Sequence, residues 1–248
     1  MSVPVSIAMC CNFYNDALAL RGLLETSAPY FDNLFCINAG PGGAYSNDGS
    51  IELCEQFGAT VVFDDIQRGF GAIRTRLLHD CGCTFGMILD ADERFHPILP
   101  VLHCEGTEKF PDVAEPNLSC HRMEGVCNQG ALLKRLVQDP SLQAIRATRR
   151  HWFEHAMRKP AQNWLFERDH QLRIVRNSPD IVYKSDVVMH EKLIDLRTNA
   201  DPKYSEQHDY EGPFIDHYHL HYRRVLPGFK QAREENYRRL ERGEPMLP

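Results

Sequence analysis

Residues 3–89 alternate between short apolar runs and longer segments with helical periodicity, a pattern that few folds accommodate. Apolar, β-rich runs at residues 3–10, 34–37, 60–63 and 85–89 predict buried strands. Between them, apolar side chains recur at helical spacing in residues 16–26, 50–57 and 72–78. Strands and helices that alternate in this way form right-handed crossovers in a parallel sheet. The sequence therefore predicts an α/β fold with a mainly parallel, Rossmann-like sheet.

Composition excludes several other classes of protein. The chain has 248 residues, of which 43% are hydrophobic and 25% charged, as in ordinary globular proteins. Its net charge of −6 argues against non-specific nucleic-acid binding, which needs a basic surface. No apolar run approaches the roughly 18–20 residues of a membrane span, and residues 1–10 lack the basic start of a signal peptide. Nine cysteines without a C-x-x-C motif indicate reduced thiols and a cytoplasmic location.

Three carboxylates, Asp90, Asp92 and Glu93, follow the apolar run at residues 85–89. Ligands of parallel sheets bind beyond the carboxyl ends of the strands, so these side chains lie where a ligand is expected. Two carboxylates two residues apart point the same way and suit Mg²⁺ or Mn²⁺, with a nucleotide diphosphate completing the shell. A solvated acidic turn or a helix cap is the alternative interpretation.

A glycine-containing segment at residues 69–71 precedes the third helix, which carries Arg74 in its first turns. Such a loop lets a ligand approach a helix N-terminus, although by itself it is more typical of a plain turn. Histidines form a further signal, because His190 follows an apolar run and His217, His219 and His221 alternate along a predicted strand. Either His190 or His217 could supply an imidazole to a metal held by Asp92. His190 is favoured because it ends a predicted strand and is followed by the carboxylate Glu191, and His217 is the runner-up. Packing of a half-exposed strand is the alternative.

Three carboxylates compete for the role of general base, namely Glu167, Asp169 and Glu191. Trp164 and Phe166 lie close to Asp169 in sequence, and apolar walls disfavour the charged form of a carboxylate. This proximity favours Asp169, followed by Glu191. The alternative for this segment is ordinary ion pairing with neighbouring arginines.

Seven short motifs occur in an order along the chain that is typical of a known protein family. They are Asn12-Phe13-Tyr14-Asn15, Asn47-Asp48-Gly49-Ser50, Gly69-Phe70-Gly71-Ala72-Ile73-Arg74, Leu89-Asp90-Ala91-Asp92-Glu93, Asp169-His170-Gln171-Leu172-Arg173, Val188-Met189-His190-Glu191 and Ile215-Asp216-His217-Tyr218. In this order the motifs resemble those of family 2 glycosyltransferases, which have the nucleotide-diphospho-sugar-binding GT-A fold. The branch that contains lipopolysaccharide-core glucosyltransferases is the most similar.

This resemblance implies a metal-dependent hexosyltransferase that moves a sugar from a nucleotide diphosphate, with a UDP-sugar expected, to a hydroxyl of a saccharide acceptor with inversion. Residues 1–94 would bind the donor, residues 95–222 would contain an insertion and the smaller acceptor-side part of the same domain, and residues 223–248 would form a basic tail. The implied metal, Mn²⁺ or Mg²⁺, would be bound by Asp92 with His190 or His217. Asp169 and Glu191 would be catalytic. The implied donor contacts are Asn12, Asn38, Asp65, Arg74, Asp90 and Ala91.

Two departures from the family pattern keep other functions open. Asn38 stands where the family has a strand-two aspartate, and a glycine-rich stretch at residues 39–46 follows it. Residues 95–148 match no known pattern and contain several prolines. A sugar nucleotidyltransferase-like metal enzyme is one alternative, although residues 10–16 lack a basic phosphate-binding loop. A catalytically degenerate sugar-nucleotide-binding module is the other. The basic tail is interpreted as a solvated helix face or, alternatively, as a peripheral contact with an anionic membrane or a lipid-linked acceptor.

Overall fold

Parallel strands make up the first half of the sheet in the computed structural model. The model describes residues 4–99, 127–153, 159–160, 170–185, 191–204 and 213–219, and positions 235, 238, 239, 242 and 244. The strands are β1 (Ile7–Phe13), β2 (Asn33–Gly40), β3 (Thr60–Asp65) and β4 (Phe85–Ile88), and neighbours pair in parallel in the order β3-β2-β1-β4. The helices between them are α1 (Ala17–Ser27), α2 (Ser50–Gln56) and α3 (Phe70–Asp80). Short 3-10 turns are η1 (Ala28–Tyr30), η2 (Pro41–Gly43) and η3 (Ile66–Arg68).

The predicted alternation of strands and helices is confirmed, with differences at the boundaries of the strands. β1 extends to Phe13 and β2 to Gly40, beyond the apolar runs that predicted them. Asn12 and Asn38 are therefore strand residues, paired in the β1–β2 register with Ile37 and Phe13 respectively. The apolar pattern did not predict this extension, because the added residues include the polar side chains Asn12 and Asn38.

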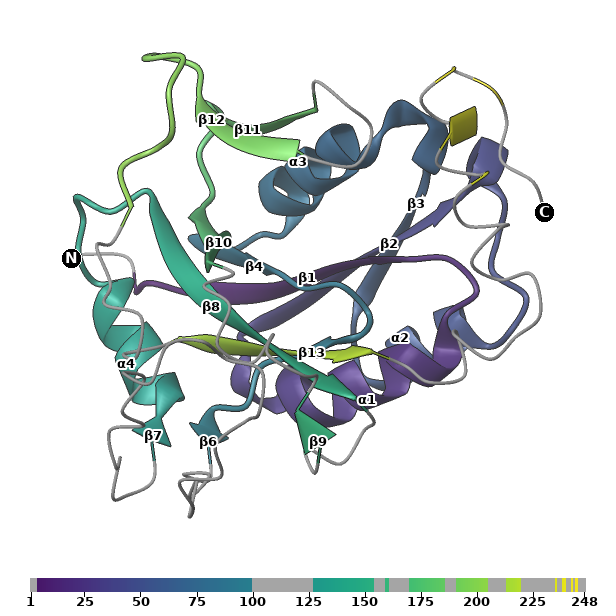
Figure 1. Ribbon diagram of the computed structural model, residues 1–248, viewed down its shortest axis with the longest axis horizontal. Helices are drawn as coiled ribbons and strands as arrows, with labels where there is room; N and C mark the ends of the chain where they lie inside the picture. Colours follow the sequence, from purple (N-terminus) through teal and green to yellow (C-terminus); the bar gives the residue numbers. More distant parts are fainter. Residues whose placement is uncertain are drawn as a thin grey trace, which may run out of the picture.

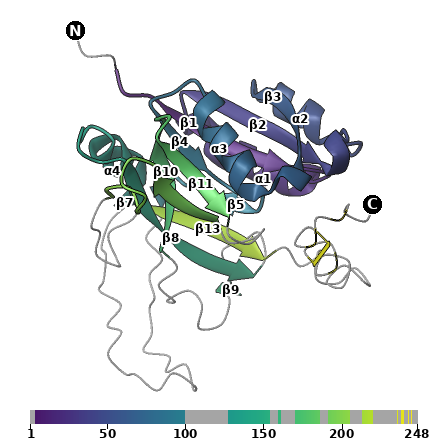
Figure 2. The same cartoon turned by 90° about the horizontal axis from the view of Figure 1, so that it is seen from above.

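The second half of the chain continues the same sheet. Its strands are β5 (Glu93–Arg94), β8 (Ala144–Phe153), β9 (Lys159–Pro160), β10 (His170–Arg176) and β13 (Phe214–His219). β10 is antiparallel to both β4 and β8, whereas β13 is parallel to β8 and antiparallel to β5. Figure 2 shows β10, β8 and β13 continuing the sheet beyond β4. The short apolar runs at residues 172–175 and 181–183 lie within β10 and β11, whereas the apolar run that precedes His190 lies outside the described residues.

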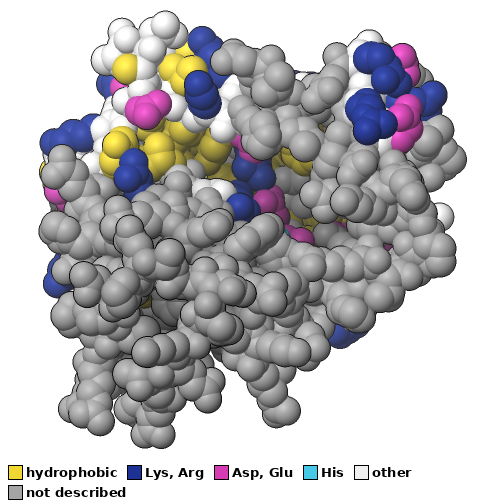
Figure 3. Space-filling model, in the orientation of Figure 1, with side chains coloured by type: hydrophobic (Ala, Val, Ile, Leu, Met, Phe, Trp, Pro, Cys, Tyr) yellow, Lys and Arg dark blue, Asp and Glu magenta, His cyan; other side chains and the backbone are white. Residues whose placement is uncertain are grey.

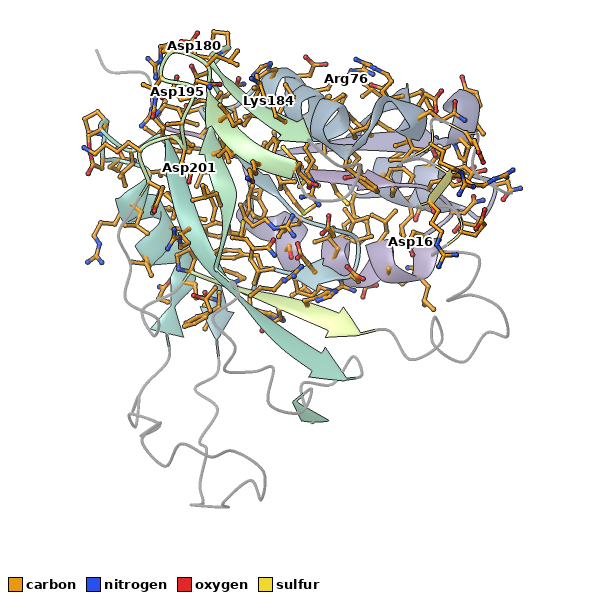
Figure 4. The ribbon with its side chains drawn as sticks, turned by 45° about the horizontal axis from the view of Figure 1, so that its top comes forward. Asp16, Arg76, Asp180, Lys184, Asp195 and Asp201 are labelled. Carbon is orange, nitrogen blue, oxygen red and sulfur yellow. The ribbon has the colours of Figure 1, made fainter. Side chains whose placement is uncertain are left out.

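Smaller elements accompany the sheet. The hairpin of β11 (Ile181–Ser185) and β12 (Glu191–Asp195) is antiparallel, as is the short pair of β6 (Ile98–Leu99) and β7 (Cys127–Asn128). α4 (Gln129–Leu136) follows Asn128, whose side chain caps the helix by accepting from the N–H of Ala131 at 2.8 Å. Asp195, the last residue of β12, is labelled in Figure 4. Its Oδ2 accepts from Arg197 Nη2 at 2.7 Å and from Gln143 Nε2 at 3.0 Å.

Two buried clusters of side chains lie on opposite faces of the sheet. α1 and α2 cover one face, where Leu20 and Leu23 pack against Met9 of β1. α3 and the β11–β12 hairpin cover the other face, where Leu77 and Leu78 are in the same cluster as Ile181 (Figure 1). β1, β2 and β4 are parallel, so their carboxyl ends present their side chains at the same edge of the sheet.

No helix within the described residues is long and apolar enough to cross a membrane. Within the described residues, six cysteines are free thiols. Most of the tail helix expected at residues 229–242 lies outside the described residues. The positions that are described carry ion pairs, since Arg242 contacts Glu235 at 3.2 Å and Glu244 at 2.8 Å.

Candidate functional site

A tight turn follows β4 and carries the acidic motif. The N–H of Leu89 donates to Cys10 O at 2.9 Å, which keeps residue 89 alongside β1. The N–H of Glu93 then donates to Asp90 O at 2.8 Å, while the Glu93 carboxylate accepts from the N–H of Asp90 at 3.0 Å. These reciprocal bonds close the turn, so that Asp92 lies at its outer part with its side chain 19% exposed.

Two arginines from distant elements bind Asp90. Arg74 Nη2, from α3, lies 2.7 Å from Asp90 Oδ1, and Arg173 Nη2, from β10, lies 3.0 Å from Asp90 Oδ2. Burial by itself would raise the pKa of Asp90, but the two guanidinium charges hold that pKa well below its usual range. Asp90 is therefore a carboxylate at any ordinary pH, with each of its oxygens bound to a separate arginine.

Glu93 is the most deeply buried carboxylate of the same ion-pair network. Its side chain is completely buried, and its Oε1 lies 2.9 Å from Arg173 Nη2 and 3.4 Å from Arg149 Nη1. Burial by itself would lower the pKa of Arg173, but Glu93 and Asp90 raise it. An ion pair with these partners is the arrangement that a buried carboxylate needs in order to stay charged.

Arg74 connects this network to Glu191, the first residue of β12. Arg74 Nη1 contacts Glu191 Oε1, and the Glu191 side chain is only 7% exposed. One guanidinium thus joins two of the predicted site residues, Asp90 and Glu191, which are separated by a hundred residues in the chain. On the face of the molecule that Figure 3 shows, acidic and basic side chains lie next to each other in a hollow near the middle.

Asp92 and His217 are the candidate metal ligands that the fold brings together. His217 Nε2, from β13, lies 3.5 Å from Asp92 Oδ2, and both side chains are about one-fifth exposed (18% and 19%). The pairing of β13 with β5 places His217 directly opposite Glu93. Among the described residues no group of three or more potential ligands could hold a metal. A carboxylate and an imidazole fit Mn²⁺ or Mg²⁺ as two ligands of a shell that a ligand's phosphates and water would complete.

The other predicted donor contacts lie at the ends of β1, β2 and β3. Asn12 Oδ1 is buried without a hydrogen-bond partner. Asn38 is completely buried, and its amide is used within the glycine-rich loop: Nδ2 donates to Ala44 O at 2.8 Å, and Oδ1 accepts from the N–H of Ser46 at 3.0 Å. Asp65 Oδ1 likewise accepts from the N–H groups of Gly42 and Gln67, each at 2.9 Å.

Some predicted residues cannot be placed. Asp169 and His190 lie outside the described residues, as does Glu167. Ala91 is buried, and its carbonyl accepts from Arg94 Nη1 at 2.8 Å, so its side chain offers no contact to a ligand.

Sequence reasoning missed the structural roles of Glu93, Arg149 and Arg173. Arg173 ends one of the motifs that suggested the resemblance, and that was the signal available for it. Glu93 likewise ends the motif at residues 89–93, whereas Arg149 had no signal, because a single charge in an apolar strand does not reveal whether it is buried or solvated.

Comparison with known proteins gave structural likenesses only. No family model and no curated protein sequence matches the chain. One similar solved structure is glucosyl-3-phosphoglycerate synthase from Mycobacterium tuberculosis in complex with Mn²⁺, UDP and glucosyl-3-phosphoglycerate. The sequences are 12% identical, the match covers 61% of this chain and 45% of the synthase chain, and the TM-score is 0.33. Another is mannosyltransferase PcManGT from Pyrobaculum calidifontis in complex with GDP-Man and Mn²⁺, with 14% identity, 60% and 37% coverage and a TM-score of 0.38. The matched part spans less than half the length of either protein.

Proposed function

We propose that this chain is a metal-dependent glycosyltransferase that uses a nucleotide-diphosphate sugar. The observation that carries the proposal is the contact of Asp92 with His217 at the carboxyl edge of the sheet, beside the arginine-bound Asp90. The solved structures named above contain Mn²⁺ together with UDP or GDP-Man, which is consistent with the proposal. A UDP-sugar is the expected donor, from the resemblance of the motifs to family 2 glycosyltransferases.

The charges of the site support a diphosphate ligand. Four carboxylates and three guanidinium groups form it: Asp90, Asp92, Glu93, Glu191, Arg74, Arg149 and Arg173. The cluster carries one net negative charge with His217 neutral, and a bound divalent cation would make it net positive. Such a cation would stabilise the negative charge that develops on the departing diphosphate.

Different residues of the site serve different purposes in this proposal. Asp92 and His217 hold the metal, with His190 as a further ligand, and the buried Asn12 Oδ1 accepts from the donor. Asp90 fixes Arg74 and Arg173 instead of binding the metal, because each of its oxygens already contacts an arginine. The acceptor is a saccharide, free or lipid-linked, in the cytoplasm. Its hydroxyl oxygen attacks the anomeric carbon of the donor sugar and displaces the nucleotide diphosphate, with the inversion that the resemblance to family 2 glycosyltransferases implies.

A panel of nucleotide sugars tests the proposal. We expect slow Mn²⁺-dependent hydrolysis of one UDP-sugar in the absence of acceptor, and none in excess EDTA. Asp92→Asn removes a ligand charge and should lower the rate by at least about 10²-fold. Asp139→Asn is a matched control, since Asp139 is an exposed carboxylate that accepts from the N–H of Ser141. Full hydrolysis in EDTA would exclude a metal-dependent reaction.

The catalytic base is proposed to be Asp169. Asp169→Asn keeps the shape of the side chain and removes its basicity, so sugar transfer should fall by roughly 10²–10⁴-fold while donor affinity stays nearly unchanged. Glu191→Gln is the companion variant, because Arg74 already binds Glu191. Normal transfer by Asp169→Asn together with loss of transfer in Glu191→Gln would assign the base to Glu191.

A catalytically degenerate binding module remains the second candidate, and the buried Asn38 favours it. Its amide donates to Ala44 O and accepts from the N–H and the hydroxyl of Ser46, and these bonds compete with the nucleoside contact that the resemblance implies at this position. Such a module would bind a UDP-sugar with Mn²⁺ but would neither hydrolyse nor transfer it. Calorimetric binding without turnover across the whole panel would identify this case.

A further inference from the structure

Arg94, the second residue of β5, binds the backbone of the acidic turn and connects it to α1. Its side chain is almost completely buried, and Nη1 donates to Ala91 O at 2.8 Å and to Glu93 O at 2.7 Å. Nη2 donates to Ala19 O in α1 at 2.9 Å. A guanidinium offers several donors in one rigid plane, so this group joins the turn to the helix in a defined geometry.

The two carbonyls that Arg94 binds flank Asp92. Peptide groups 91 and 93 are therefore fixed on either side of the residue whose carboxylate contacts His217. The backbone of Arg94 also pairs with Asp216 of β13, the neighbour of His217. One residue thus touches both chain segments that carry the candidate metal ligands.

Gly22 makes room for this guanidinium in the middle of α1. A Cβ at Gly22 would lie 2.9 Å from both Cζ and Nε of Arg94 and closer still to Nη2. Glycine is unfavourable inside a helix, so a helix normally has a larger residue at such a position. The close approach of Arg94 is the reason the structure gives for a glycine here.

We infer that Arg94, seated against Gly22, is a positioning residue that sets the orientation of the Asp92 carboxylate for metal binding. The inference rests on the proposed function, because it requires Asp92 to bind a metal. Groups that do not touch a metal but orient its ligands typically change metal affinity by 10–100-fold when they are altered. Arg94 acts on Asp92 through the backbone of the turn instead of through a side-chain hydrogen bond.

Metal titration of two conservative variants tests the inference. Mn²⁺ binding is measured by electron paramagnetic resonance well below the unfolding temperature of each variant. Arg94→Lys keeps the charge but loses the planar set of donors, and it should weaken Mn²⁺ binding by about 10–100-fold. Arg176→Lys is the matched control: Arg176 also donates to two backbone carbonyls, Leu142 O at 2.9 Å and Asp139 O at 3.1 Å, but it pairs with Phe85 at the opposite end of β4. It should lose stability without losing Mn²⁺ affinity.

Gly22→Ala provides a second route that leaves Arg94 in place. The added methyl group should displace the guanidinium and weaken Mn²⁺ binding in the wild-type background. In an Arg94→Met background the same substitution should leave Mn²⁺ affinity unchanged, because the group it displaces is gone.

Four outcomes would overturn the inference. Equal loss of Mn²⁺ affinity in Arg94→Lys and Arg176→Lys would show a general effect of destabilisation. An equal effect of Gly22→Ala in both backgrounds would show that the glycine acts independently of Arg94. Wild-type protein that binds no Mn²⁺ would overturn the metal site itself and with it the inference, whereas wild-type binding with unchanged variants would overturn the inference alone.

Discussion

Two aspartates two residues apart have opposite surroundings at this site. Asp90 has an arginine on each oxygen, whereas Asp92 faces the imidazole of His217 and retains partial exposure. A carboxylate that is already bound to two guanidinium groups gains little from a cation, and a cation would repel those groups. In the proposed function, the metal ligand of the motif is therefore Asp92 and not Asp90.

Removal of Arg173 should destabilise the fold strongly. Arg173→Met leaves the fully buried Glu93 with Arg149, 3.4 Å away, as its remaining arginine. Loss of one partner of a buried ion pair typically costs 3–5 kcal/mol, so we expect a decrease of about 3–5 kcal/mol in the free energy of unfolding. Chemical denaturation measures it. Arg21→Met is the control, because the Arg21–Glu25 pair is exposed and such pairs contribute about 0–1 kcal/mol. Equal losses in both variants would contradict this account.

Substitutions of two histidines in similar positions can distinguish a role in metal binding from a role in packing. His217 and His96 each lie 3.5 Å from a carboxylate, Asp92 and Asp216 respectively, with similar exposure. His217→Ala should weaken Mn²⁺ binding at least about tenfold, whereas His96→Ala should leave it unchanged. His190→Ala belongs in the same titration, since the sequence hypothesis favours His190 over His217 as the further ligand. Small and equal effects from all three substitutions would mean that none of these histidines binds the metal.

At the scale of elements, α3 and β10 bring arginines to the end of β4 from opposite directions along the chain. Gly69 has a φ of 85°, a conformation that favours glycine, and the first turns of α3 follow it with Arg74 facing Asp90. β10 has an irregular register between Leu172 and Ile174, and Arg173 lies at this irregularity. A bulge of this kind redirects a side chain, here toward Asp90 and Glu93.

The loop after β2 is organised around Asn38. An aspartate at this position, which the motif resemblance would lead one to expect, should destabilise the loop. Asn38→Asp removes the donor to Ala44 O and places a charge in a fully buried position. We expect the free energy of unfolding to fall by about 1–3 kcal/mol, the cost of an unsatisfied buried group, with no gain in UDP affinity. Asn33→Asp is the matched control: its amide makes the same kind of contact with Cys81 O at 2.8 Å, but it is only partly buried. Tighter UDP binding by Asn38→Asp would show that the loop still accommodates a nucleoside contact.

For the whole molecule, the site joins the two layers of the fold. Arg94 connects the acidic turn to α1 on one face of the sheet, while Arg74 and Glu191 belong to α3 and β12 on the other. The buried clusters on both faces therefore hold the same set of charges in place. We expect the stability of the whole fold to depend on the ionisation of the site.

This dependence predicts a loss of stability in acid. The folded-state pKa of Asp90 is lowered below the unfolded value of about 3.9, so Asp90 contributes stability that is present above about pH 4 and is lost as the pH falls toward the folded pKa. Thermal unfolding of the wild type between pH 7 and pH 2 should show this decline. Asp90→Asn should be less stable than the wild type at pH 7 and should decline less steeply below pH 4. Parallel pH profiles of the two proteins would contradict the assignment.

The local pattern of the sequence determined the elements and the edge at which a site could form. Periodicity of apolar side chains predicts strands and helices because each element buries one side or stripe, and the D-x-D motif follows a buried strand by simple counting. Asp90 and Asp92 follow from this counting, Arg74 from the glycine-containing segment before the third helix, and His217 from the alternation of histidines along a predicted strand.

Only the tertiary structure decided which of these groups face one another. Positions 74, 90, 173 and 191 are far apart in the chain, and no local pattern indicates which carboxylate will have an arginine on each oxygen. The same is true of Asn38, whose amide is used by its own loop, and of Arg94, whose partner is a glycine in α1. Ion pairs and close packing depend on distances between remote segments, and those distances exist only once the sheet and its two layers have formed.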